Sequence, residues 1–270
     1  MEIVRLDNEV FFKRAFTDQI VFRAFVKDIV GIDVQPDKIE TEKAFQPRVG
    51  NANFKYDIFA EDKKQRVIIE IQRVEYDHNF DRFLHYHLQA ITEQQRSNVN
   101  YSVERTVYTI VVMTAPYRVD AITHEFYRDE VLISKLNPKN LKGIERKLFN
   151  HELIFLNPNY KGPDTPENYR DWLDLIYESI HNPSNIKVNL KNKGVKRAVK
   201  LLTYDNISPD ELEQAKIEAG TRQVLKLELA DKVMEIAINM KNKGASFDFI
   251  SETTGLTIEQ VKKLPAAFEK

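Results

Sequence analysis

The sequence predicts an α/β core over about residues 1–160, with a mixed central sheet flanked by helices, followed by an all-helical region over 161–270. Three observations support this prediction. Short runs of bulky and β-branched residues recur between residues 54 and 156, as they do in buried strands. Helical periodicity precedes and follows those runs. The content of 42% hydrophobic and 30% charged residues is typical of a soluble globular chain with a substantial core.

The individual elements follow from local patterns. Apolar spacing predicts one continuous first helix, capped by Asp7 or Asn8 and ended by Gly31. The run 105–113 is apolar on both faces, which predicts a central strand. The expected helices cover residues 8–30, 79–97 and 165–180, and the expected strands cover 54–60, 66–72, 105–113, 124–133 and 146–156.

Overall charge and composition exclude several classes of protein. With 40 basic and 41 acidic residues the net charge of -1 identifies no partner, so a nucleic-acid surface would have to be a local basic patch. Cysteine is absent, which excludes disulfides, thiolate metal sites and cysteine nucleophiles and suits a cytoplasmic location. Charges within the first apolar run argue against a signal peptide, and no window approaches ~18 uninterrupted apolar residues, so no membrane span is expected.

The two runs at 54–60 and 66–72 predict a hairpin with a defined register. If residues 62–65 form its loop, Glu61 pairs with Arg66, and counting back places Asp57 directly opposite Glu70. Their Cβ atoms would then lie ~5 Å apart on the same face. A slip of one residue would turn Asp57 to the other face, so this pairing depends on the loop length.

Two facing carboxylates repel each other and need something between them. A shared proton would raise the pKa of one of them, and a divalent cation is the alternative. Mg²⁺ prefers carboxylate oxygens, waters and phosphate oxygens, which such a pair offers. Gln72 lies on the same side of its strand as Glu70 and can orient a water or a phosphate without adding charge. An exposed polar face of an edge hairpin remains the simpler alternative, although the apolar residues around Glu70 argue against full exposure.

The order of these residues resembles the PD-(D/E)XK nuclease superfamily and, within it, the Rpn family of recombination-promoting nucleases and transposases. The resemblance implies a restriction-endonuclease-like core, a DNA endonuclease dependent on Mg²⁺ or Mn²⁺, and a role in recombination or transposition. The resemblance implies DNA as the partner and no membrane association, and it leaves self-association open. The segments that carry the resemblance are DNEVFFKRAF, YDIFAED with VIIEIQ, DRFLHYHLQAI and KNKGASFDFISETTGLTIEQVKKL.

The resemblance also implies a catalytic set, namely Asp57, Glu70 and Gln72, with a metal held by Asp57, Glu70 and the backbone carbonyl of Ile71. Tyr56 stands where Pro is usual, and Gln72 stands where Lys is usual. Glutamine cannot act as a base at neutral pH. A hydroxide generated at the metal, or a base near the scissile phosphate, would have to serve instead, so catalysis is expected to be weak or to need a second metal.

Arg82 and Tyr86 are one helical turn apart and share a face. They match an Arg/Tyr pair that recurs in the family, which implies contact with phosphate or a brace for the carboxylates. Alternatively, Arg82 pairs with Asp81 or Glu61, and Tyr86 lies at the edge of the core.

The histidines and the acids of the first helix are expected to bind no metal. His85 and His87 would point to different faces of their helix, so these residues and His78 are expected to be solvated or to contact phosphate. Glu9 or Asp18 could add a third carboxylate, as in some members of the superfamily, but a surface charge is expected for both.

Two later segments are candidates for DNA contact. Residues 185–202 contain six basic residues and no acid, and their spacing suits a helix with one basic face that binds phosphate or is merely solvated. The tail, 232–264, resembles a helix-turn-helix joined at Gly255, for which packing or dimerisation is the alternative because Glu259 lies early in its second helix. The basic candidates are Lys191, Lys193, Lys196, Arg197 and Lys200.

Three functions are therefore compatible with the sequence. The first is a metal-dependent DNA endonuclease, which the order of the motifs favours. The second is a catalytically weak or inactive DNA-binding protein on a nuclease fold, suggested by Gln72 in place of lysine. The third is a protein-interaction module that uses the helical tail.

Overall fold

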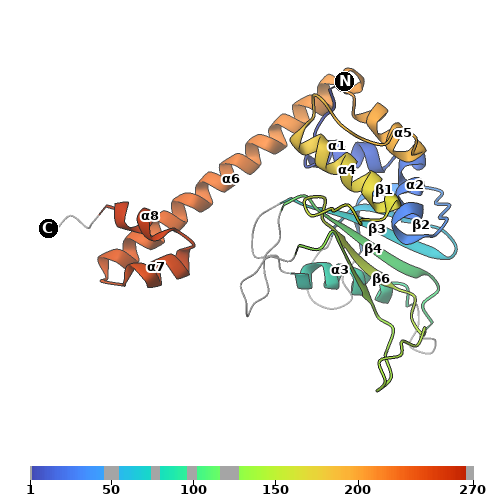
Figure 1. Ribbon diagram of the computed structural model, residues 1–270, viewed down its shortest axis with the longest axis horizontal. Helices are drawn as coiled ribbons and strands as arrows, with labels where there is room; N and C mark the ends of the chain where they lie inside the picture. The colour runs from blue at the N-terminus through green and yellow to red at the C-terminus, as the bar shows by residue number, and fades with distance from the viewer. Residues whose placement is uncertain (1, 46–54, 74–79, 96–101, 116–127, 266–270) are drawn as a thin grey trace. The chain divides into compact units, whose positions relative to one another are not determined.

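The computed structural model describes residues 2–45, 55–73, 80–95, 102–115 and 128–265 (Figure 1). The chain divides into two compact units, unit 1 (Met1–Leu212) and unit 2 (Glu213–Lys270). Within the described residues, no helix is both long and apolar enough to cross a lipid bilayer.

A mixed six-stranded sheet with the strand order β1-β2-β3-β4-β6-β5 forms the centre of unit 1. The pairs β3–β4 and β4–β6 are parallel, whereas β1–β2, β2–β3 and β5–β6 are antiparallel. The mixed sheet predicted from the sequence is confirmed, with β4 in a central position. The strands are β1 (Ile39–Ala44), β2 (Lys55–Glu61), β3 (Gln65–Gln72), β4 (Thr106–Met113), β5 (Val131–Lys135) and β6 (Glu152–Leu156).

Helices cover both faces of this sheet. Helix α3 lies on one face, where Tyr86 packs with Phe59 and Ile68, and the other helices of unit 1 gather on the opposite face (Figure 1). The helices of unit 1 are α1 (Glu9–Phe16), α2 (Gln19–Val30), α3 (Phe80–Thr92), α4 (Glu167–His181) and α5 (Lys193–Leu202). A short 3₁₀ helix, η1 (Tyr204–Asn206), follows α5.

The first helical region is two helices, and the prediction of one continuous helix over 8–30 is wrong. The break lies at Thr17 and Asp18, because the Asp18 carboxylate accepts hydrogen bonds from the amides of Ile20 and Val21 and so begins a new helix. The predicted caps are confirmed at both outer ends. Asn8 caps α1, and Gly31 ends α2 in the left-handed conformation with φ of 79°.

Unit 1 extends well beyond residue 160, where the sequence suggested that the core ends. The reason is that α4 and α5 pack against α2 in the same apolar layer. The fully buried Trp172 of α4 contacts Phe25 edge-on, with ring centroids 5.1 Å apart. Gly194 of α5 lies so close that an added Cβ would be 2.4 Å from Cβ of Ala24. These two helices therefore belong to unit 1.

Unit 2 contains most of α6 (Pro209–Asn242), together with α7 (Phe247–Thr254) and α8 (Ile258–Lys263). A small apolar core unites the end of α6 with α7 and α8, and it includes Ala237, Ile250 and Val261. The turn between α7 and α8 falls at Gly255, with φ of 72°, as the sequence indicated.

His87 lies in the core between α3 and β4, and the expectation that it is solvated or contacts phosphate is wrong. Its side chain is only 1% exposed, and Nδ1 lies 2.9 Å from Oγ1 of Thr109. His85 is exposed, as expected, and His78 lies outside the described residues. The position on the helix explains the difference, because His87 lies one turn after Phe83 on the buried face of α3, whereas His85 lies off that face.

The burial of His87 predicts a loss of stability in mild acid. Burial, and secondarily the nearby His151, lowers the pKa of His87 from 6.5 to about 4. Since the unfolded chain takes up this proton first, the contribution of His87 to stability is full above pH 6.5 and falls as the pH drops toward about 4, by roughly 3 kcal/mol in total. Urea unfolding of wild type and His87→Gln over this pH range should show a flatter pH dependence for the variant. Parallel curves would contradict the assignment.

Candidate active site and metal centre

The register of β2 and β3 brings Asp57 and Glu70 together. Glu61 pairs with Arg66 and Ile58 with Ile69, which is the register that the four-residue loop predicted. Continued by one residue, this register places Asp57 across from Glu70.

Next to the pair Ile58 and Ile69, hydrogen bonds from backbone amides to carboxylates connect β2 and β3. The amide of Asp57 donates to Oε1 of Glu70 at 3.2 Å, and the amide of Ile71 donates to Oδ2 of Asp57 at 2.9 Å. Each carboxylate is therefore fixed by the backbone of the other strand. Ile71, which was expected to contribute its carbonyl to a metal, contacts Asp57 through its amide.

A third carboxylate comes from β1, which the sequence did not reveal. Thr41 pairs with Ile58 and Lys43 with Tyr56, so Glu42 lies across from Asp57 on the side opposite Glu70. Glu42 has φ of 54°, and among the described residues other than glycine no second positive φ occurs. Such a conformation costs about 1–3 kcal/mol and is concentrated at functional sites.

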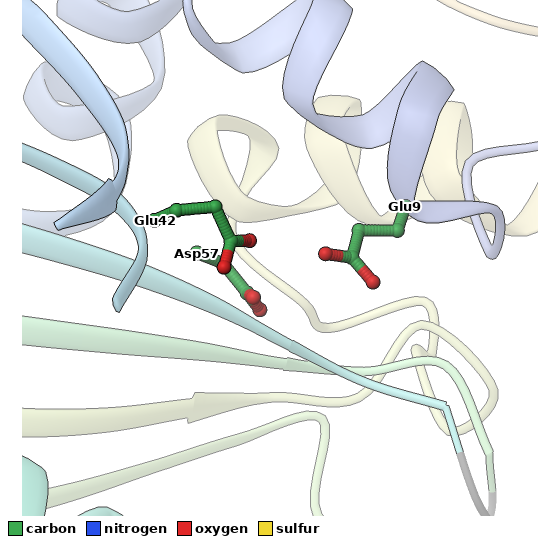
Figure 2. A group of neighbouring side chains, drawn as sticks. All are labelled: Glu9, Glu42 and Asp57. Atoms are coloured by element: carbon green, nitrogen blue, oxygen red, sulfur yellow. The ribbon is translucent and has the colours of Figure 1, made fainter. Parts of the chain in front are cut away.

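A fourth carboxylate comes from the first turn of α1. One carboxylate oxygen each from Glu9, Glu42 and Asp57 lie within 4.8 Å of one another, and Figure 2 shows the three side chains converging from α1, β1 and β2. Glu9, which was expected to be a surface charge, is half-buried. Asp18, the other acid considered, instead caps α2 and pairs with Arg197 at 2.6 Å.

Two cations accompany these acids. Lys13, one helical turn after Glu9, contacts the carboxylates of both Glu9 and Glu42 with its ammonium group. Arg73, just after β3, lies 2.6 Å from Oε2 of Glu9. Lys13 could have been suspected from its position four residues after Glu9, but no pattern in the sequence places it beside β1.

The electrostatics of the site are dominated by burial. Glu70 is 1% exposed, and burial followed by the negative charge of Asp57 raises its pKa well above the ordinary value. Burial also raises the pKa of Asp57, although the amide of Ile71 opposes the shift. For Glu9, burial is outweighed by Lys13 and Arg73, and the pKa is lowered. The site therefore combines carboxyls that resist ionisation with a carboxylate that is neutralised by cations.

Arg82 and Tyr86 are brought together at the edge of this site. Nε of Arg82 donates to the hydroxyl of Tyr86 at 3.0 Å, and the charge of Arg82 acts on Glu70 to lower its pKa. Tyr86 is 6% exposed and belongs to the core cluster, as the alternative interpretation expected, and its functional role stays a prediction. Glu61, one alternative partner of Arg82, pairs with Arg66 at 2.8 Å.

Gln72 ends β3 two residues after Glu70 and is half-buried. Its backbone carbonyl accepts hydrogen bonds from the amide and the hydroxyl of Thr114 at 2.9 and 3.1 Å. These bonds fix the backbone of Gln72 at the end of the strand.

The basic face expected over 185–202 is only partly available. Helix α5 begins at Lys193, and Arg197 is committed to the ion pair with Asp18. The remaining candidates are exposed, namely Lys191, Lys193, Lys196 and Lys200. In unit 2, α8 spans only six residues, and Lys241 donates to the carbonyls that end it, with 2.7 Å to that of Leu264.

The mixed sheet with flanking helices defines a protein with a restriction-endonuclease-like fold, in which Asp57 and Glu70 face each other on β2 and β3. Residues 27–221 match the family of PD-(D/E)XK nuclease family transposases, and the chain belongs to this family. No curated protein and no solved structure matches the chain. The matched region begins inside α2, so Glu9 and Lys13 lie before it.

Proposed function

We propose that this chain is a DNA endonuclease that hydrolyses phosphodiester bonds with the help of Mg²⁺ or Mn²⁺ and acts in recombination or transposition. The observation that carries the proposal is the convergence of Glu9, Glu42 and Glu70 on Asp57 in a member of a nuclease family. DNA is the proposed partner, because the family consists of nucleases and transposases.

The donor set fits a hard divalent cation. It consists of carboxylate oxygens, which Mg²⁺ and Mn²⁺ prefer over nitrogen or sulfur. Asp57 is common to two groupings, one with Glu9 and Glu42 and one with Glu70 and the proposed carbonyl ligand of Ile71. When bound there, a divalent cation would polarise the scissile phosphate and acidify a water molecule.

Lys13 is proposed to supply the positive charge that the motif lacks at Gln72. Although burial opposes it, the contacts with Glu42 and Glu9 raise the pKa of Lys13, so the side chain stays an ammonium ion. An ammonium beside the carboxylates stabilises negative charge that develops on a phosphate, but it cannot accept a proton from water. Gln72 is proposed to orient that water through its amide group.

Arg82 and Tyr86 are proposed to position Glu70. The guanidinium lowers the cost of ionising the buried carboxyl, and the hydroxyl of Tyr86 fixes the guanidinium by the 3.0 Å hydrogen bond. Neither side chain needs to touch the substrate for this effect.

The proposal is tested by the metal requirement of the purified full chain. Supercoiled plasmid should be nicked with Mg²⁺ or Mn²⁺ and left intact with EDTA. Burial, followed by the charge of Asp57, raises the pKa of Glu70 well above its ordinary value, so metal binding competes with a proton at this carboxyl and the half-saturating Mn²⁺ concentration should fall as the pH rises. Salt-sensitive DNA binding without nicking under any metal would instead indicate a DNA-binding protein on a nuclease fold.

A further inference from the structure

The connection between β5 and β6 forms an arm, residues 136–150, that lies outside the core. A strand was expected over 146–156, but β6 begins only at Glu152. Figure 1 shows the arm in yellow-green, extending beyond the end of β6. Every residue of the arm except Asn137 is exposed.

The arm is ordered by its own hydrogen bonds. Oδ1 of Asn137 accepts the amides of Leu148 and Phe149 at 3.0 and 2.8 Å. Oδ1 of Asn140 accepts the amides of Lys142 and Ile144 at 2.9 and 3.0 Å. No burial of apolar surface offsets the entropy cost of ordering the arm. Its defined shape therefore points to a binding role, as in other compact surface loops.

The charge of the arm differs from that of the whole chain. The arm contains four cations and one acid, whereas the chain has a net charge of -1. The acid, Glu145, accepts a hydrogen bond from Nδ2 of Asn137 at 3.0 Å. None of the four cations forms an ion pair with another residue that the structure describes: Lys139, Lys142, Arg146 and Lys147.

Large apolar side chains lie between these cations on the surface. Leu141 is fully exposed, Leu148 is 67% exposed and Phe149 is 50% exposed. A second copy of the arm would bring like charges together, and an apolar protein partner would bury the cations without counter-charges. A duplex satisfies both features, because phosphates neutralise the cations and apolar side chains insert at the minor groove.

We propose that the arm binds duplex DNA at a distance from the carboxylate site. Glu152, where the arm rejoins the sheet, pairs with Tyr108, which in turn pairs with Val67, three residues before Glu70. The arm thus leaves the sheet about 10 Å along the strands from the carboxylates and on the far side of β4. It would hold the DNA that flanks the cleaved bond. This inference requires that the chain binds DNA, but not that it cleaves it.

The test is a fluorescence anisotropy titration of labelled duplex with the full chain in EDTA, at several salt concentrations. A variant with the four arm cations changed to Gln is compared with a control in which four exposed lysines elsewhere in unit 1 are changed to Gln: Lys27, Lys38, Lys63 and Lys64. The arm variant should bind about 10–100-fold more weakly, and the slope of log affinity against log salt should fall by about 3. The lysine control should retain most of the DNA affinity and most of the salt slope. Since all eight positions are exposed, thermal melting should be unchanged.

The apolar side chains are tested by L141S and F149S together. This pair should weaken binding while leaving the salt slope of wild type, because no cation is lost. Equal affinity and slope for the arm variant and the lysine control would overturn the proposal. Loss of binding to anionic phospholipid vesicles with unchanged DNA binding would also overturn it, since the arm would then recognise a lipid surface. If the chain binds duplex through the arm but nicks no plasmid with metal, only the proposed nuclease activity fails.

Discussion

Glu70→Gln is expected to abolish metal-dependent nicking and, at the same time, to make the protein more stable. The carboxylate is a proposed metal ligand, and an amide of the same shape is a poor one, so the nicking rate should fall by at least about 100-fold. Glutamine can still accept the hydrogen bond from the amide of Asp57, so the local backbone should persist. What disappears is the cost of holding a buried carboxylate beside Asp57.

The gain in stability should depend on pH in a defined direction. The folded pKa of Glu70 lies well above the ordinary 4.5, so the folded chain holds this proton more tightly than the unfolded chain does. The contribution of Glu70 to the stability of the wild type therefore falls as the pH rises above 4.5 toward the folded pKa. Glu70→Gln lacks this loss and should melt about 2–4 °C higher at neutral pH, for a gain of about 1 kcal/mol. The difference should vanish near the ordinary pKa.

Melting curves in EDTA, from about pH 4.5 to about pH 8, measure this effect. Glu104→Gln is the matched control, because Glu104 is exposed at the start of the β4 region and should change neither stability nor nicking. A Glu70→Gln protein that nicks plasmid like wild type would remove Glu70 from the site. A variant that is inactive but less stable at neutral pH would contradict the raised pKa of Glu70, because the folded chain would then favour the charged carboxylate.

The contrast between Glu70 and Glu42 shows what could be predicted from the sequence. Asp57 and Glu70 belong to one hairpin, so a four-residue loop and the two-residue repeat of a strand were enough to place them opposite each other. Glu42 reaches the same row of the sheet through a separate strand and a backbone with φ of 54°. No local propensity predicts a glutamate in that conformation, because the cost is borne by the surrounding tertiary structure.

Similar reasoning applies to the helices. The break at Thr17 and Asp18 carries a local signal, an Asp that caps the following turn, which the strong apolar spacing on either side obscured. The packing of α4 and α5 onto α2 depends on contacts between residues far apart in the sequence, made by Trp172 and permitted by the absence of a side chain at Gly194. A purely helical pattern after residue 163 cannot distinguish a separate helical domain from helices that complete the layer over a sheet.

Lys13→Met is expected to reduce the turnover number for nicking by about 10–100-fold while the apparent affinity for Mn²⁺ increases. The lysine neutralises Glu9 and Glu42 and contributes positive charge at Asp57. Without it, the carboxylates attract a divalent cation more strongly, but no ammonium remains to stabilise charge on the phosphate. Lys13→Arg keeps the charge and should restore part of the rate. Lys27→Met, at an exposed lysine of α2, is the control and should behave as wild type.

The opposite shifts of turnover and metal affinity separate this role from a structural one. If Lys13 only joined α1 to β1 through its contacts with Glu9 and Glu42, its loss would lower the melting temperature and weaken metal binding and turnover together. In that case the ion pairs of Lys13 would matter only for the packing of α1 against β1. Lys13→Arg would then restore the melting temperature, and the nicking rate would recover in parallel with it. A Lys13→Met protein with wild-type turnover at saturating Mn²⁺ would show that Lys13 does not supply the positive charge that Gln72 lacks. The positive charge at the scissile phosphate would then have to come from another side chain, and Arg73, which already lies 2.6 Å from Glu9, is the next to test.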